Sequence, residues 1–108
     1  CPSASRVRPV MRVAWTDRGK ARLRQIRAYI AKDQPLNADR FADRVTRRVE
    51  QLVEHPRSGK IVEQYQRDDL RELIESSYRI IYLILEDRID ILTVRDTRRV
   101  LPRRLDDL

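Results

Sequence analysis

The spacing of the apolar residues changes part-way along the chain, and this change constrains the fold more than any other feature of the sequence. Up to about residue 55, apolar side chains recur every three or four positions, which predicts amphipathic helices. The first helix is expected from Asp17, capped by Thr16, to about Lys32. The second is expected from about Asn37 to His55. From Leu70 onward the apolar residues alternate or run together, which predicts strands.

The predicted second helix begins after a break at residues 33–35. Asn37 is a good N-cap, and Leu36 and Phe41 flank it at the spacing of a hydrophobic staple. We therefore expect the helix to start near Asn37. The short break between the two helices predicts an antiparallel helical hairpin.

The strand-like segments are short and joined by short connections. One precedes the first helix at residues 12–16, and three follow the second at Leu70–Ile74, Tyr78–Leu85 and Ile89–Val94, with room for a short strand at residues 61–62. The nearly all-apolar segment from Tyr78 predicts a central strand covered on both faces. In the last strand, Ile91 and Thr93 are expected to share one face. This order predicts an α+β fold: an N-terminal strand, a two-helix hairpin and a three-stranded antiparallel meander, with the hairpin on one face of a mainly antiparallel sheet.

The chain is long enough for one domain. It has 108 residues, of which 41% are hydrophobic, and this supports a single core. Residues 1–10 contain Pro and Ser without a hydrophobic period, so we expect a disordered leader or tag there and a single domain over residues 11–108. The longest apolar run, residues 80–85, is too short for a bilayer, so no membrane contact is expected. A single Cys excludes an intrachain disulfide and favours the cytoplasm.

Several kinds of chemistry lack the residues that they need. One Cys and one His leave little material for a zinc site, and two Gly exclude Gly-rich phosphate loops. The acidic residues form no metal signature, so no metal and no cofactor are expected. His55 precedes Pro56 at a helix end and has no marked partner, which favours a capping role over catalysis. No catalytic residue is assigned.

The arginines are the more informative charged residues in a chain of net charge +7. Arg79 lies within the most apolar strand, where a charge must reach a cleft, the sheet rim or a partner. Five more follow the last strand: Arg95, Arg98, Arg99, Arg103 and Arg104. These six could form one positive patch at a sheet end, or could be separate solvated charges. A basic surface fits nucleic acid and an acidic protein equally well.

Two further expectations concern the strands and the segment after them. Tyr78 and Tyr82 share one face of their strand, and with Trp15 they are expected in the core rather than in a stacking platform for bases. After Arg95 the apolar content drops, and only Val100 and Leu101 look able to anchor the chain. We therefore expect the segment Arg95–Arg104 to contribute more to function than to folding.

The order and spacing of several short motifs resemble the RelE/ParE toxin superfamily, and its ParE branch best. The motifs run through nearly all of residues 11–102: VAWT, IRAYIAKDQP, F-x-x-x-V-x-x-x-V-x-x-L, HPRSG, LREL, SSYRIIYLI, IDILTV and RR-x-LP. The resemblance implies a cytoplasmic type II toxin with a helical hairpin on a curved sheet. It also implies a cognate antitoxin, encoded beside the toxin, that wraps and neutralises it. ParE-like members inhibit DNA gyrase, whereas RelE-like members cleave messenger RNA, mostly on the ribosome.

The residues that match the nuclease branch are its arginines, not its proton-transfer groups. Arg79 matches the Arg of the YR pair, and Arg98 or Arg99 matches the Arg after the last strand. Glu72 stands in a strand that is Lys-rich in the nucleases, and Asp96 stands where many relatives have His. This favours a gyrase inhibitor. The alternatives are a ribosome-dependent endoribonuclease that uses Arg79, Glu72 and Arg98, and an antitoxin-binding module that has lost toxicity. Direct contact with nucleic acid stays open.

Overall fold

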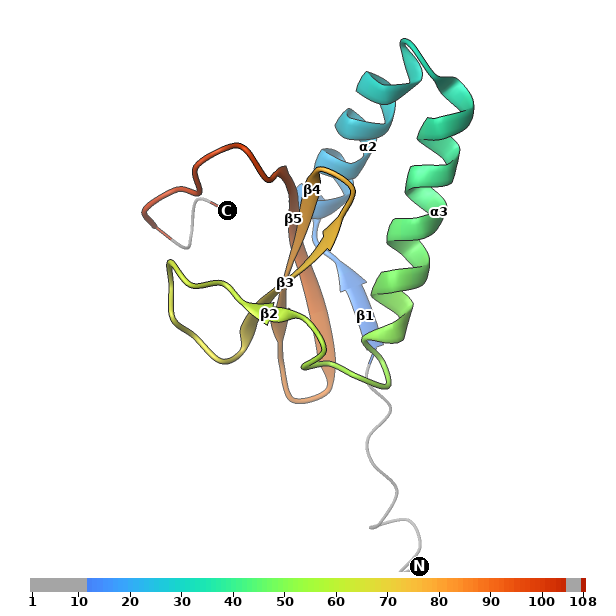
Figure 1. The fold of residues 1–108 in the computed structure, drawn as a ribbon. Coiled ribbons are helices and arrows are strands. Elements are labelled where there is room, and N and C mark those ends of the chain that lie inside the picture. Colours follow the sequence, from blue (N-terminus) through green and yellow to red (C-terminus); the bar gives the residue numbers. More distant parts are fainter. Residues whose placement is uncertain (1–11, 105–107) are drawn as a thin grey trace, which may run out of the picture.

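A computed structural model describes residues 12–104 and residue 108, and its elements follow the predicted order (Figure 1). They are β1 (Arg12–Trp15), α2 (Asp17–Ala31), α3 (Pro35–Gln51), β2 (Lys60–Ile61), β3 (Leu70–Glu75), β4 (Tyr78–Ile84) and β5 (Arg88–Asp96). The α+β class is therefore confirmed, with a fifth strand, β2, one residue earlier than expected. The expected leader, residues 1–10, lies outside the described residues. No described helix is long and apolar enough to cross a membrane.

The strands form one mixed sheet in the order β1-β5-β4-β3-β2. β3, β4 and β5 pair antiparallel as predicted, whereas β1 pairs parallel to β5, with Trp15 opposite Ile91. Figure 1 shows the α2–α3 hairpin on one side of this sheet and the C-terminal segment on the other. β1 therefore forms one edge of the sheet. It pairs only with residues 88–91 of β5, and α2 lies over the C-terminal end of β5.

The start of α2 is fixed to β5 by its cap. The Thr16 hydroxyl accepts a hydrogen bond from Gly19 N at 3.0 Å and donates one to Ile91 O at 2.8 Å. Gly19 is buried, and a Cβ at this position would lie 2.5 Å from Ile91 O. The glycine that weakens the first turn by propensity is thus required by the close approach of the helix to the strand.

The second helix starts earlier than the sequence predicted. It begins at Pro35, with Gln34 as its N-cap residue, and Asn37 lies inside the first turn. The proline suits this place because the first helical residues need no N–H donor within the helix. The side chain of Leu36 is 62% exposed, so the predicted hydrophobic staple to Phe41 is wrong.

The sheet is covered on both faces at its centre, as the apolar run in β4 predicted. Ile80 packs into the helix-side core and Ile81 into a smaller core on the other face, and both are fully buried. Leu101 and Leu108 belong to the second core, so the C-terminal segment helps to cover this face. Leu101 is an anchor as expected, whereas Val100 is 86% exposed and does not anchor the segment.

A bulge in β5 changes which residues face the helices. The register shifts between Ile81 and Tyr82, so that Tyr82 pairs with Ile91 while Ile81 pairs with Thr93. Ile91 and Val94 therefore both reach the helix-side core, and Thr93 lies buried beside Ile81 instead. The simple alternation that placed Ile91 and Thr93 on one face is wrong, because a bulge inserts one residue.

Candidate functional site

The first candidate site is a cleft of about 330 Å³ on the sheet face that is turned away from the helices; we call it the Arg79 cleft. Its floor consists of Glu72 on β3 and Arg79 on β4, and the β2 region and the C-terminal segment form its walls. The lining residues are Lys60, Ile61, Val62, Glu63, Gln64, Glu72, Arg79, Arg99, Val100 and Leu101.

An ion pair occupies the floor of the Arg79 cleft. Nη1 of Arg79 lies 3.3 Å from Oε2 of Glu72, and the two side chains are 21% and 12% exposed. Arg79 Nε and Glu72 Oε2 are buried without a hydrogen-bond partner among the described residues. The charge inside the apolar strand thus reaches a cleft, where it is paired with the carboxylate of Glu72.

The wall formed by the C-terminal segment is held in place by hydrogen bonds to the β2–β3 connection. Gln64 Nε2 donates to Pro102 O at 2.7 Å, and the Tyr65 hydroxyl donates to the same oxygen. Together with the buried Leu101, these contacts hold the chain against the sheet and place Arg99 at the rim of the cleft.

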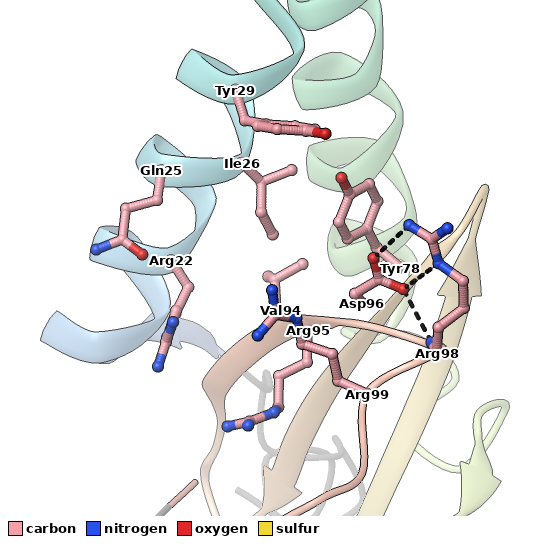
Figure 2. Close-up of a pocket in the computed structure, with 10 residues that line it drawn as sticks. All are labelled: Arg22, Gln25, Ile26, Tyr29, Tyr78, Val94, Arg95, Asp96, Arg98 and Arg99. Atoms are coloured by element: carbon pink, nitrogen blue, oxygen red, sulfur yellow. Dashed lines mark hydrogen bonds and ion pairs between the residues drawn. The ribbon is translucent and has the colours of Figure 1, made fainter.

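The second candidate site is a pocket of about 400 Å³ between α2 and the C-terminal end of β5; we call it the α2 pocket. It is lined by Arg22, Gln25, Ile26 and Tyr29 of α2, Tyr78 of β4, and Val94, Arg95, Asp96, Arg98 and Arg99. Figure 2 shows the guanidinium groups of Arg22, Arg95 and Arg99 toward one end and the rings of Tyr29 and Tyr78 toward the other. The pocket therefore has a cationic end and an aromatic end.

Among the described residues of the α2 pocket, one arginine forms an ion pair and three do not. Asp96 binds Arg98 at 2.9 Å, and this contact lowers the pKa of Asp96 to about 2. Burial, and then the nearby Arg22, lower the pKa of Arg95, whose Nε is buried and has no acceptor in the described part of the chain. Within residues 12–104 and 108, no carboxylate forms an ion pair with the remaining cations: Arg22, Arg95 and Arg99.

The six arginines singled out in the sequence are distributed over the two candidate sites and the segment that follows β5. Arg79 lines the Arg79 cleft, Arg95 and Arg98 line the α2 pocket, and Arg99 lines both. Arg103 and Arg104 are exposed and line neither. Sequence reasoning missed Arg22 and Tyr29, because on a helix face they look like ordinary solvated residues. Only the docking of α2 over β5 brings them to the pocket.

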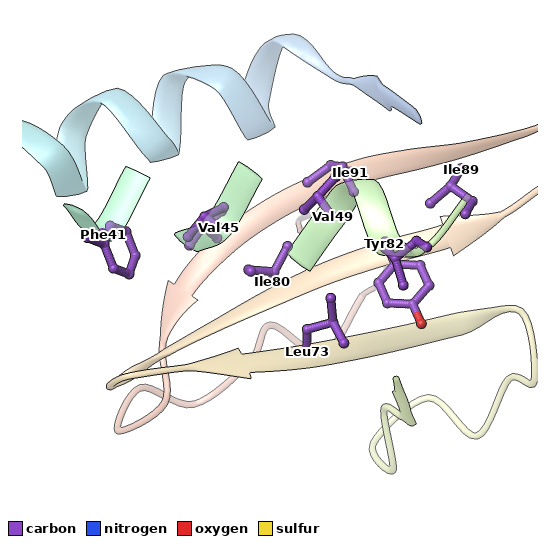
Figure 3. Close-up of a cluster of buried hydrophobic side chains, with 10 residues drawn as sticks. Phe41, Val45, Val49, Leu73, Ile80, Tyr82, Ile89 and Ile91 are labelled. Atoms are coloured by element: carbon purple, nitrogen blue, oxygen red, sulfur yellow. The ribbon is translucent and has the colours of Figure 1, made fainter. Parts of the chain in front are cut away.

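The tyrosines that could transfer protons lie outside the Arg79 cleft. Tyr82 is fully buried in the helix-side core, where its hydroxyl donates to Pro56 O at 2.8 Å, and burial raises its pKa (Figure 3). Tyr78 packs edge-to-face on Phe41 with ring centroids 5.2 Å apart, and burial raises its pKa too. His55 is exposed and lines neither site. Among the described residues of the cleft, the carboxylates Glu63 and Glu72 are the candidate proton acceptors.

Metal chemistry finds no support in the described part of the chain. Residues 12–104 and 108 contain no group of three or more His, Cys, Asp or Glu side chains that could hold a metal ion.

Comparison with known proteins places this fold and sequence among bacterial toxins. The family model for the ParE toxin of the type II toxin–antitoxin system parDE matches residues 13–101. A protein named as a candidate toxin, Y4kP of Sinorhizobium fredii, is 38% identical over 96 residues, which are 87% of this chain and 96% of that protein. Toxin RelE2 of Caulobacter vibrioides is 34% identical over 89 residues, which are 82% of this chain and 97% of that toxin.

Two solved structures share the fold. A chain of the chromosomal ParDE system from P. aeruginosa superimposes with a TM-score of 0.68 at 19% identity and covers 81% of this chain and 96% of its own. A double mutant of the E. coli toxin RelE in its free state gives a TM-score of 0.59 at 14% identity and covers 82% and 85%. Both branches of the superfamily therefore share the α+β architecture, and the architecture alone does not separate them.

Proposed function

The chain belongs to the ParE toxin family of type II toxin–antitoxin systems, and from this premise we propose that it arrests growth by binding and inhibiting DNA gyrase in the cytoplasm. Membership of the family implies a cognate antitoxin as the protein partner. The observation that carries the proposal is the pairing of Arg79 with Glu72, because it compensates the cation that a nuclease of this fold would aim at phosphate.

RNA cleavage through the 2′-hydroxyl has three requirements, and this cleft meets the two that concern proton transfer poorly. It needs a base for the hydroxyl proton, an acid for the leaving oxygen and positive charge on the phosphate. Arginine is a poor base because it stays protonated at physiological pH. No Tyr or His lines the cleft among the described residues, and the Tyr82 hydroxyl donates its hydrogen bond to Pro56 O. These absences support binding rather than cleavage.

A ribonuclease is the second candidate, and the position of Glu72 favours it. Glu72 and Glu63 lie in a cleft with three cations: Lys60, Arg79 and Arg99. A carboxylate among cations could act as a general base while the cations hold the phosphate. Glu72 is therefore the residue on which the choice between the two functions depends.

The target-binding surface is proposed on the arginines of and after the last strand. Arg98 is paired with Asp96 but is exposed, as are Arg99, Arg103 and Arg104. We expect Arg103→Glu with Arg104→Glu to relieve growth arrest while the protein stays folded and still binds antitoxin. Arg40→Glu with Arg47→Glu is the matched control, because both arginines are exposed on α3 and line neither site. If the control variant relieved growth arrest as well, the effect would be one of net charge and not of this surface.

The experiment that tests the function compares two substrates with the same purified toxin. Gyrase with DNA is assayed for supercoiling and for stabilised breaks, and ribosome-bound message is assayed for cleavage. We expect gyrase inhibition with intact message. Message cleavage that disappears in Arg79→Ala or Glu72→Gln would overturn the proposal in favour of the nuclease. Antitoxin binding without either activity would identify a module that has lost toxicity.

A further inference from the structure

We propose that the α2 pocket binds one nucleotide of a single-stranded nucleic acid, with the phosphate against Arg22, Arg95 and Arg99 and the base against Tyr29. This inference goes beyond the inhibition of gyrase and does not depend on it. The α2 pocket is also distinct from the Arg79 cleft: of the described residues that line the two sites, they share only Arg99.

The cationic end of the pocket is built for an anion. Arg95 is partly buried, its pKa is lowered by burial and by its cationic neighbours Arg22 and Arg99, and its Nε has no acceptor among residues 12–104 and 108. Like charges held together in a partly desolvated place cost free energy, and a bound anion would relieve that cost. Guanidinium groups match phosphate oxygens through paired, charge-assisted hydrogen bonds.

The aromatic end calls for a flat group on the same ligand. Tyr29 is 69% exposed although it is a large aromatic residue, and it lies next to Ile26 in the lining of the pocket (Figure 2). An exposed ring beside an apolar floor is a stacking surface, and stacking on a base needs no particular base identity. A volume of about 400 Å³ falls within the range of small-ligand pockets and can hold a nucleotide.

A single-stranded nucleic acid can bind at both ends of the α2 pocket, whereas a duplex or an acidic peptide can bind only at the cationic end. In a duplex the bases are stacked on one another, so a duplex would offer its phosphates to the arginines and no free base to Tyr29. An acidic peptide would offer carboxylates to the same arginines but no flat ring to the tyrosine unless its sequence supplied one. The presence of a cationic end and an exposed ring in one pocket therefore favours a nucleotide over a duplex or an acidic peptide.

The test measures binding of a fluorescent oligothymidylate of about eight nucleotides to the full chain by anisotropy, without gyrase or ribosomes. We expect Tyr29→Ala to weaken binding roughly 5- to 150-fold and Tyr29→Phe to keep it, because the ring and not the hydroxyl stacks. Arg22→Ala should weaken binding at least about tenfold and lower the salt slope by about 0.7. Arg47→Ala is the matched control for charge and should change the affinity less than about twofold.

Three further probes separate the sources of the signal. A nucleoside monophosphate should compete, which would show that one nucleotide suffices; a duplex of the same sequence should bind without sensitivity to Tyr29→Ala. An oligoglutamate of equal charge should bind more weakly than the strand. Equal binding of wild type and Tyr29→Ala to the single strand would overturn the proposal. Equal affinity for oligoglutamate, lost in Arg22→Ala, would assign the pocket to an acidic protein segment instead.

Discussion

Arg79 and Glu72 face each other across neighbouring strands, with Nη1 3.3 Å from Oε2 and no more than 21% of either side chain exposed. Each charge is therefore tolerated at the floor of the cleft because the other is present. Removal of one partner leaves an uncompensated charge in a place that is largely screened from water, whereas removal of both leaves an apolar patch beside Ile81. The pair can be tested as a unit of stability, apart from its part in function.

The single variants Glu72→Leu and Arg79→Leu are expected to lower the free energy of unfolding by about 1–3 kcal/mol each, less than for a fully buried pair. The double variant should lie within about 1 kcal/mol of wild type, because both desolvation costs are removed together. Chemical denaturation of the four proteins gives the coupling energy. The exposed pair of Arg12 and Asp87, 3.9 Å apart, is the control and should show a coupling below about 0.5 kcal/mol. Additive single effects at Glu72 and Arg79 would show that the pair is not coupled.

Gly19→Ala should destabilise the protein, against the rule that Ala favours helices. Ala gains about 1 kcal/mol in helix propensity, but its Cβ would lie 2.5 Å from Ile91 O, a backbone atom that cannot move aside cheaply. We expect a net loss of about 1–2 kcal/mol in the free energy of unfolding, measured by urea titration. Lys20→Ala, at the exposed next position, should stay within about 0.5 kcal/mol of wild type. A more stable Gly19→Ala protein would mean that α2 does not rest on β5 as closely as described.

The same region illustrates what the sequence could and could not predict. Apolar spacing identifies α2 and the strands because it reports local geometry, and Thr16 is a recognisable cap. The parallel pairing of β1 with β5 is a long-range contact that no local pattern encodes, and it decides that α2 covers the end of β5. The start of the second helix was misplaced because Asn37 is a strong local signal, while Pro35 can begin a helix just as well.

The residues of the candidate sites also fall into those that the sequence could predict and those that it could not. Arg79 could be predicted because a charge in an apolar strand is anomalous, and the ion pair explains how it is accommodated. Arg22 and Tyr29 could not, because polar and aromatic residues on an exposed helix face are common. Thr93 was misplaced because the bulge in β5 depends on how two strands pair, which alternation within one strand does not reveal.

Tyr82→Phe should lower the free energy of unfolding by about 1–2 kcal/mol, although the ring that packs in the core is kept. The lost hydroxyl donates to Pro56 O at 2.8 Å and accepts from Gly59 N at 3.0 Å, so the loop after α3 loses two contacts to the sheet. Hydrogen exchange should show faster exchange of the Gly59 amide, which separates this effect from general loosening. Tyr29→Phe is the matched control, because Tyr29 is 69% exposed, and should change stability by less than about 0.5 kcal/mol. Unchanged protection at Gly59 would contradict the role of the hydroxyl.

The carboxylate of Asp96 should make the free energy of unfolding depend on pH in the acid range, and Asp96→Asn should remove this contribution. Its pKa is lowered from 3.8 to about 2, mainly by Arg98, so folding favours the ionised carboxylate. This stabilisation is present in full above the unfolded value and is lost as the pH falls from about 3.8 through about 2. The difference in unfolding free energy between wild type and Asp96→Asn should therefore be largest above this range and shrink as the pH falls. The carboxylate of Asp68, whose pKa is lowered by Arg57 and Arg71, is kept in both proteins and cancels in the comparison. Denaturation at a series of pH values measures the difference, and Arg98→Met should reduce the same dependence, because it removes the main cause of the shift. A constant difference across this pH range would contradict the assignment of the ion pair to the folded state.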